Sequence, residues 1–209
     1  MANQTGSAGI KAVVFDLYDT LVYFPDGIQV HKKMFARLGL DEEQSKAARK
    51  LAMTECFYTL ADLAERIRPG SNLDWNDLEE ELAIRMASVQ RFPETLSVIK
   101  SLKKQGFKLG LITNLTCPAS SPIFYLSLNG YFDHINLSFQ SGMIKPDPRI
   151  YQDMIDRMHL RPEQILMIGD NFKKDVEAPR QAGMKAVHLD RSGASPDSIS
   201  TLEGIFQHL

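Results

Sequence analysis

Four short apolar runs, each followed by a polar residue, constrain the fold of this chain most strongly. They read "KAVVFD" (11–16), "FKLGLIT" (107–113), "ILMIGD" (165–170) and "KAVHLD" (185–190). Runs of this length, rich in branched apolar residues, are typical of strands buried on both faces. Residues 93–106, 148–160 and 173–183 carry helical periodicity between these runs. Strands that alternate with helices predict a parallel sheet with helices on both faces.

Residues 27–89 interrupt this alternation with three stretches of helical periodicity, 27–40, 41–67 and 74–89. The turn-forming sequence "RPGSN" separates the last two, and Asp74 is a candidate N-cap. We therefore predict an α/β fold in which a Rossmann-like parallel sheet core (1–22 and 92–209) carries an inserted all-helical cap (23–91).

Composition and charge narrow the function classes. The chain has 209 residues and a formal net charge of -2, which gives no electrostatic reason to expect nucleic acid or an anionic membrane as a partner. Cys56 and Cys117 lie far apart in sequence, so two reduced thiols in a cytoplasmic protein are expected. The first nine residues, "MANQTGSAG", do not resemble a signal peptide and predict a frayed tail. Oligomeric state, monomer or homodimer, stays open.

Polar residues gather where the predicted strands end. Asp16, Thr113 and Asp170 each close an apolar run, and Lys145 lies in the loop "SGMIKPDP" before a predicted helix. In an open parallel sheet, the loops at the carboxyl ends of the strands meet and form the site. We therefore expect these four side chains to converge.

The same residues resemble the haloacid dehalogenase-like (HAD) hydrolase superfamily. The sequence "DLYDTL" matches its first motif through Asp16, Tyr18 and Thr20, and "LITN" matches its second. The third is similar to "GMIKPDPRIY", and the fourth to "IGDNFKKD" with Asp170 and Asp175. The resemblance extends from residue 11 to about residue 190, with the helical insert matching in position and helical character only.

The resemblance implies a nucleophile, a metal and a set of phosphate ligands. Asp16 would attack a small phosphate monoester, and its ordinary pKa of about 3.9 would keep it anionic. Mg²⁺ would reduce the repulsion between the two anions. The implied metal site comprises the carboxylates of Asp16 and Asp170, the backbone carbonyl of Tyr18, and Asp175, which would orient water or Lys145. The implied phosphate ligands are Thr113, Lys145 and the backbone N–H of Asn114.

Tyr18 occupies the position at which most phosphatases of the superfamily have the aspartate that acts as general acid and base. A phenol is a poor base at neutral pH, so two alternatives to the Mg²⁺-dependent phosphatase stay open. One is a metal-independent 2-haloacid dehalogenase, a branch that has tyrosine at this position. The other is a non-catalytic binder of a phosphorylated ligand or a protein. We interpret Asp19 as a loop-shaping residue whose side chain points away from the site.

Overall fold

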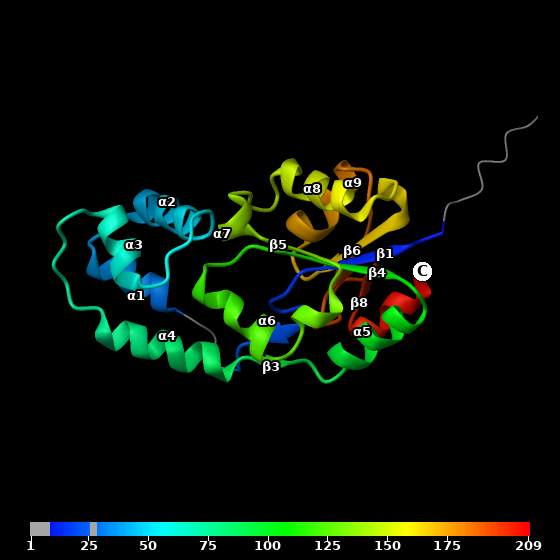
Figure 1. Cartoon of the computed structure of the whole chain (residues 1–209), viewed down its shortest axis with the longest axis horizontal. Helices are drawn as coiled ribbons and strands as arrows, with labels where there is room; N and C mark the ends of the chain where they lie inside the picture. The colour runs from blue at the N-terminus through cyan, green and yellow to red at the C-terminus, as the bar shows by residue number, and fades with distance from the viewer. Residues whose placement is uncertain (1–8, 26–28) are drawn as a thin grey trace, which may run out of the picture.

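The computed structural model describes residues 9–25 and 29–209. The predicted tail therefore lies outside the described residues except for Gly9, and so do the first two positions of the predicted helix 27–40. Figure 1 shows two regions, with helices α1 to α4 on one side and the sheet with its flanking helices on the other.

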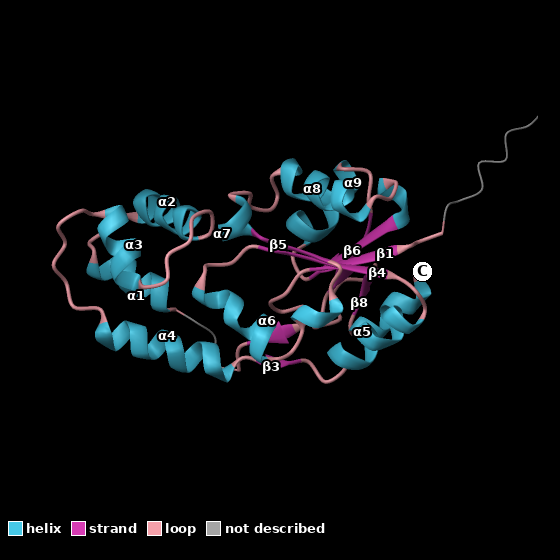
Figure 2. Cartoon of the chain, in the orientation of Figure 1, coloured by secondary structure: helices cyan, strands magenta, loops and turns pink. Residues whose placement is uncertain are grey.

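The predicted parallel sheet is present and has six strands in the order β5-β4-β1-β6-β7-β8, all of them parallel (Figure 2). Two further short strands pair antiparallel outside it. The sheet comprises β1 (Ala12–Phe15), β4 (Lys108–Thr113), β5 (His134–Leu137), β6 (Ile165–Gly169), β7 (Lys185–Leu189) and β8 (Ser198–Ile199). The antiparallel pair is β2 (Val22–Tyr23) and β3 (Gln90–Arg91). The four predicted runs thus correspond to β1, β4, β6 and β7, and the prediction missed β5, β8 and the antiparallel pair.

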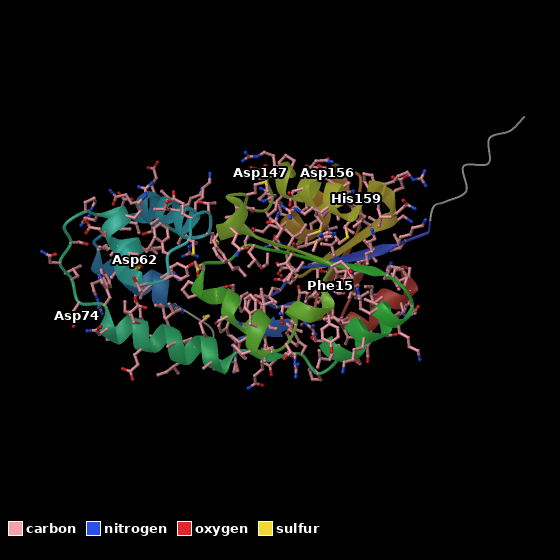
Figure 3. The ribbon with its side chains drawn as sticks, viewed as in Figure 1. Phe15, Asp62, Asp74, Asp147, Asp156 and His159 are labelled. Atoms are coloured by element: carbon pink, nitrogen blue, oxygen red, sulfur yellow. The ribbon has the colours of Figure 1, made fainter. Side chains whose placement is uncertain are left out.

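Both faces of the sheet are covered, because side chains alternate between them along each strand. In β1, Val13 and Phe15 join the apolar core on one face, whereas Ala12 and Val14 join the core on the other. Figure 1 shows α8 and α9 over one face and α5 over the other. The label on Phe15 in Figure 3 lies over the interior of the fold, and those on Asp147 and Asp156 follow the outer side of α8.

The predicted helices 93–106 and 148–160 are confirmed with small shifts of their ends, whereas only residues 178–181 of the predicted helix 173–183 are α-helical. These helices are α5 (Thr95–Lys104), α8 (Pro148–Met158) and α9 (Ala178–Gln181). A π-helical turn, η4 (Phe172–Glu177), precedes α9, and Pro179 lies in the first turn of α9, where a missing N–H is tolerated. Short helical pieces complete the core: η1 (Pro118–Ser120), α6 (Ser121–Tyr125), η2 (Asn129–Tyr131), α7 (Ser138–Ser141), η3 (Pro162–Gln164) and η5 (Leu202–Gln207).

Four helices between β2 and β3 pack around a third apolar core, which includes Met34, Leu63, Trp75 and Leu82. We call residues 30–88 the helical segment. Its members are α1 (Val30–Arg37), α2 (Glu42–Ala52), α3 (Leu60–Ile67) and α4 (Asn76–Ser88). The division of the chain at residues 23 and 91 stays a prediction.

One expectation for the helical segment was wrong, because residues 41–67 form two helices. The Asp41 side chain caps α2 in a capping box with Gln44, and the Thr59 hydroxyl caps α3. Because Thr59 begins a new helix, residues 53–59 become a connection. Asp74 lies just before α4 and accepts the Asn76 N–H at 2.9 Å. The N-cap position itself is occupied by Trp75, so the prediction of Asp74 as the N-cap was wrong by one residue. Among the helices of the described ranges, none is long and apolar enough to cross a membrane.

Candidate active site

A buried lysine between two buried aspartates forms the centre of the candidate site. The Lys145 ammonium lies 2.7 Å from Asp16 Oδ1 and 2.6 Å from Asp175 Oδ1. The three residues are 3%, 8% and 1% exposed, respectively. Buried charges of this kind are stable only when they are paired and hydrogen-bonded, so each of the three depends on the others. Asp16 follows β1, and Asp175 lies in η4 beyond β6.

Asp175 is held on both of its oxygens. Oδ1 accepts from Lys145, and Oδ2 accepts the Asn171 backbone N–H at 3.1 Å. The carboxyl group lies against Gly169, where a Cβ atom would collide with it. Glycine at the end of β6 therefore allows the carboxylate to approach the strand, and Asp175 in turn orients Lys145.

Asn114 holds the Lys145 loop through its side chain. Its Oδ1 accepts the Lys145 backbone N–H at 2.7 Å, and its Nδ2 donates to the Lys145 carbonyl at 2.9 Å. This two-point contact joins the end of β4 to the loop that carries the lysine. The Asn114 side chain is therefore a positioning group, a role that the sequence analysis did not anticipate.

These residues surround a small cavity of about 150 Å³. Its lining comprises Asp16, Tyr18, Asp19, Thr113, Asn114, Lys145, Asp170, Asn171, Lys174 and Asp175. All seven residues predicted for the site thus lie around one cavity. The lining residues include four aspartates and two lysines, a formal excess of two negative charges.

The donor set fits a magnesium ion. Oxygens of Asp16, Asp170 and Asp175 lie within 4.8 Å of one another, and Mg²⁺ prefers hard oxygen ligands. Because both Asp175 oxygens already accept hydrogen bonds, Asp16 and Asp170 are the better direct ligands. The two excess negative charges match the charge of a divalent cation.

The pKa shifts of the aspartates in the protein alone also favour a cation at this site. Burial raises the pKa of Asp16, Lys145 opposes the rise, and the negative charge of Asp175 adds to it. Burial also raises the pKa of Asp170, with further contributions from Asp175 and Asp19. The expectation that Asp16 has an ordinary aspartate pKa was therefore wrong. A bound cation favours the ionised carboxylates and opposes these shifts.

Lys145 behaves differently from the carboxyl groups around it. Burial works against its ammonium charge, but Asp16 and Asp175 outweigh burial and raise the pKa of Lys145 above its ordinary value. Lys145 therefore stays protonated at neutral pH and can donate to phosphate oxygens.

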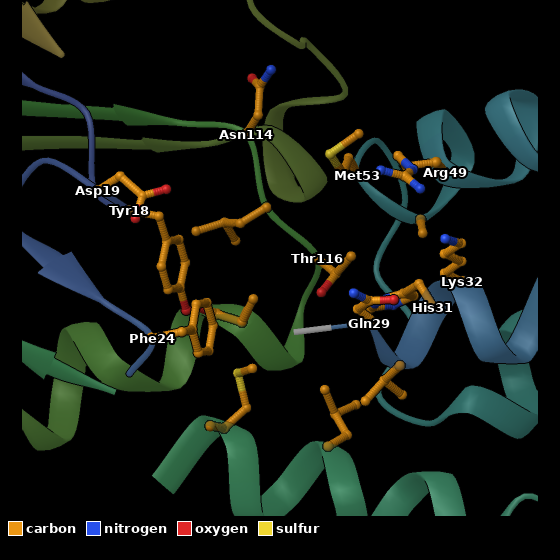
Figure 4. Close-up of a pocket in the computed structure, with 16 residues that line it drawn as sticks. Tyr18, Asp19, Phe24, Gln29, His31, Lys32, Arg49, Met53, Asn114 and Thr116 are labelled. Atoms are coloured by element: carbon orange, nitrogen blue, oxygen red, sulfur yellow. The ribbon is translucent and has the colours of Figure 1, made fainter. Parts of the chain in front are cut away.

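A larger cavity of about 680 Å³ adjoins the small one, and Tyr18, Asp19 and Asn114 line both (Figure 4). Its remaining lining comes largely from the helical segment and the loop after β4: Phe24, Gln29, Val30, His31, Lys32, Arg49, Ala52, Met53, Leu82, Met86, Leu115, Thr116 and Ala119. In Figure 4, Arg49, Lys32 and His31 lie on the side opposite Asp19 and Tyr18. Burial and the nearby Arg49 lower the pKa of His31.

Tyr18 forms part of the wall between the two cavities. Its hydroxyl donates to the Ala119 carbonyl at 2.8 Å, and its ring stacks on Phe24 with centroids 4.8 Å apart. Burial, with a smaller contribution from Tyr125, raises the pKa of Tyr18 above its ordinary value. A phenol that is already a committed donor with a raised pKa is a poor general base.

The loop after Asp16 is held by Arg191, which lies just beyond the carboxyl end of β7. Asp19 has a left-handed backbone, with a φ of 59°, and its N–H donates to the Val22 carbonyl, as a loop-shaping residue would. Its side chain nevertheless lines both cavities, so the expectation that it points away was wrong. Arg191 donates to the carbonyls of Asp19 and Thr20 at 3.2 Å and 2.7 Å. Nothing local in the sequence around Arg191 indicates this long-range role.

Comparisons with known proteins agree with the fold and identify the family. A family model described as haloacid dehalogenase-like hydrolase matches residues 10–183. A glyceraldehyde 3-phosphate phosphatase of Methanothermobacter thermautotrophicus is 29% identical over 94% of this chain and 99% of its own. A phosphatase of Mycobacterium tuberculosis is 32% identical over 91% of this chain and 92% of its own.

Solved structures of similar fold include both phosphatases and dehalogenases. A HAD phosphatase from Thermococcus onnurineus matches with a TM-score of 0.67 and 24% identity over 95% of this chain and 97% of its own. A 2-haloacid dehalogenase from Pseudomonas syringae matches with a TM-score of 0.67 and 22% identity over the same shares. At these identities the structural matches establish the fold only.

Proposed function

Because the chain belongs to the haloacid dehalogenase-like hydrolase family, we propose that it is a Mg²⁺-dependent phosphatase acting on a small phosphate monoester. The observation that carries this proposal is the buried Lys145 between Asp16 and Asp175, beside Asp170, in one small cavity. The similarity to phosphatases over nearly the whole chain supports the same reaction class.

In the proposed reaction, the Asp16 carboxylate attacks the phosphorus in line and displaces the alcohol, and water then cleaves the aspartyl phosphate. Lys145 and the Thr113 hydroxyl donate to the phosphate oxygens, together with the backbone N–H of Asn114. Asp175 keeps Lys145 in place through its contact with the ammonium. When bound, Mg²⁺ supplies positive charge that reduces the repulsion between the Asp16 carboxylate and the phosphate.

The proposed metal ligands are Asp16, Asp170 and the backbone carbonyl of Tyr18, with Asp175 behind them. Three carboxyl groups within 4.8 Å of one another support this assignment. The pKa values of Asp16 and Asp170, raised chiefly by burial, support it as well, since both carboxylates gain from a neighbouring cation.

In this proposal, each of the two cavities holds a different part of the substrate. The phosphate occupies the small cavity beside Asp16, and the rest of the molecule extends into the larger cavity, where the helical segment acts as a cap. Lys32 and Arg49 line the larger cavity, which favours a polar or anionic remainder over an apolar one. Small phosphorylated metabolites are substrates of this kind. Curated relatives include a glyceraldehyde 3-phosphate phosphatase and a phosphoserine phosphatase of Thermus thermophilus.

Hydrolysis of p-nitrophenyl phosphate, measured with Mg²⁺ and with EDTA, tests the proposal. We expect turnover with Mg²⁺ and none with EDTA. If turnover fails in both, chloride release from 2-chloropropionate tests whether the protein is a 2-haloacid dehalogenase, the alternative that Tyr18 supports. If both substrates stay intact, the result favours a non-catalytic binder.

The substitution Asp170→Asn tests the metal site separately from turnover. We expect it to weaken Mg²⁺ binding by at least about tenfold, because one of the anionic ligands becomes neutral while the side chain keeps its size. Titration calorimetry with Mg²⁺ measures the effect directly. Asp62→Asn, which neutralises an exposed carboxylate of α3, is the control, and unchanged binding by Asp170→Asn would remove Asp170 from the metal site.

The substitution Tyr18→Asp tests whether the lack of a general acid at position 18 limits turnover. We expect it to raise kcat on alkyl phosphates, whose leaving groups need a proton, and to change p-nitrophenyl phosphate turnover much less. Tyr18→Phe is the control, because it removes the hydroxyl donated to Ala119 without adding a carboxylate. Equal kcat values for Tyr18→Asp and the parent chain on alkyl phosphates would contradict this interpretation.

A further inference from the structure

The two cysteines of the chain meet where the helical segment lies against the core. Cys56 lies in the connection between α2 and α3, and Cys117 lies between β4 and η1. They are 61 positions apart in sequence, but their sulfurs are 2.7 Å apart, and both are free thiols. Since the chain has two cysteines in total, the only pair it can form joins these two parts.

The position of Cys117 connects this contact with the candidate active site. Its neighbour Thr116 lines the larger cavity, and the carbonyl of Ala119 accepts the Tyr18 hydroxyl. The Cys117 carbonyl accepts from the Ser120 hydroxyl at 2.7 Å, which helps to fix the backbone of this turn. A covalent bond from Cys56 to Cys117 would therefore join the helical segment to a wall of the proposed substrate cavity.

We propose that Cys56 and Cys117 form a reversible disulfide that holds the helical segment on the core and slows turnover. Formation of the disulfide does not depend on the phosphatase reaction, whereas its effect on turnover rests on that proposed function. In the reduced protein the helical segment is joined to the core through its two chain connections, before α1 and after α4. The disulfide adds a third connection, which restrains any opening of the larger cavity that substrate entry and product release require.

A peroxide supplies the oxidising equivalents. Cys56 is exposed, whereas burial and the neighbouring Cys56 thiol raise the pKa of Cys117 to about 12, so Cys56 is the better first nucleophile. The Cys56 thiol gives up its proton, the thiolate attacks hydrogen peroxide, and the O–O bond breaks to give a sulfenic acid and hydroxide, which takes up that proton and becomes one water. The Cys117 sulfur then attacks the Cys56 sulfur, the S–O bond breaks, and the disulfide and a second water form. Two thiols and one peroxide thus become one disulfide and two waters.

The sequence predicts a cytoplasmic protein, and disulfides in reducing compartments are transient and regulatory. The test therefore measures both the formation of the disulfide on oxidation and its reversal by a reductant. The full chain is treated with hydrogen peroxide, its remaining thiols are alkylated, and the intact mass and the peptides are measured without reduction. We expect the loss of two hydrogens in the monomer, one linked peptide pair containing Cys56 and Cys117, and reversal by dithiothreitol.

Function and stability provide the second readout. We expect the oxidised protein to hydrolyse p-nitrophenyl phosphate with a kcat several-fold lower than the reduced protein, and to unfold at a Tm several degrees higher. Cys56→Ser and Cys117→Ser are the matched controls. Each should keep the turnover of the reduced protein and lose the response of both kcat and Tm to peroxide.

Two results would overturn the inference. One is that both cysteines of the peroxide-treated monomer stay alkylatable, or become separate sulfinic acids, with no linked peptide pair. The other is that the linked protein keeps the kcat and Tm of the reduced form, which would show that the bond restrains nothing. If the reduced protein hydrolyses no phosphate monoester, the phosphatase proposal fails, but the peptide mapping and the Tm still test the disulfide.

Discussion

We expect the substitution Asp16→Asn to lower kcat on p-nitrophenyl phosphate by about 10³-fold or more, because the neutral amide cannot attack phosphorus. Asparagine has nearly the same shape as aspartate, and its Oδ1 can still accept from Lys145. The ion pair between Lys145 and Asp175, at 2.6 Å, is retained. The variant should therefore fold and still lose turnover, which separates chemistry from stability. Steady-state kinetics with Mg²⁺, together with the Tm, measure both.

The control for Asp16→Asn is Asp62→Asn, on the exposed surface of α3 (Figure 3). It removes the same charge far from the cavity and should leave kcat unchanged. If Asp16→Asn kept more than about a tenth of the parent kcat, attack by Asp16 could not be the main route. A loss of turnover in Asp62→Asn as well would point to net charge instead of the nucleophile.

The second large effect is expected on stability. Lys145→Met leaves Asp16 and Asp175 buried without their shared cation, and breaking a buried pair from one side costs about 3–5 kcal/mol of the free energy of unfolding. Urea unfolding in EDTA measures this loss, because EDTA prevents a metal ion from replacing the lysine charge. Turnover should fall as well, since the variant lacks the ammonium that donates to the phosphate.

A surface ion pair provides the matched control for Lys145→Met. Lys103 lies 3.0 Å from Asp133, and both side chains are more than a third exposed. Lys103→Met should cost less than about 1 kcal/mol. In the double variant Lys145→Met with Asp175→Asn, the loss should be smaller than the sum of the two single losses, because one of the unpaired carboxylates is gone. Equal losses of unfolding free energy in Lys145→Met and Lys103→Met would show that the buried ion pairs of Lys145 contribute no more to stability than the exposed pair of Lys103.

The sequence predicted the site better than it predicted the details of the fold. Asp16 and Asp170 directly follow β1 and β6, Thr113 is the last residue of β4, and these strands are neighbours in the sheet. Parallel neighbours bring their carboxyl ends together, so local patterns were enough to identify three corners of one cavity. Lys145 was found by its motif alone, since nothing in its local pattern indicates a lysine that is 3% exposed.

The features that the sequence analysis failed to predict leave no clear local pattern in the sequence. Strand β5 reads "HINL" and mixes polar with apolar residues, and β2, β3 and β8 have two residues each, so none has a clear period. The break between α2 and α3 was missed because residues 41–67 read as one helical pattern. The contacts that Arg191 makes with the loop after Asp16, and the contact of Cys56 with Cys117, join positions 61 or more residues apart. Local sequence patterns carry no signal for such contacts.

The two adjoining cavities have an evolutionary consequence. Around the small cavity of the proposed phosphatase, a substitution alters a carboxylate, an ammonium or the loop that holds one, so we expect selection for turnover to constrain nearly every position there. Much of the larger cavity is lined by residues of the helical segment, such as Arg49, Met53 and Leu82, and this segment has an apolar core of its own. Mutations there can accumulate without disturbing Asp16 or Lys145. A lineage built on this plan can thus acquire a new substrate while its inherited chemistry stays intact.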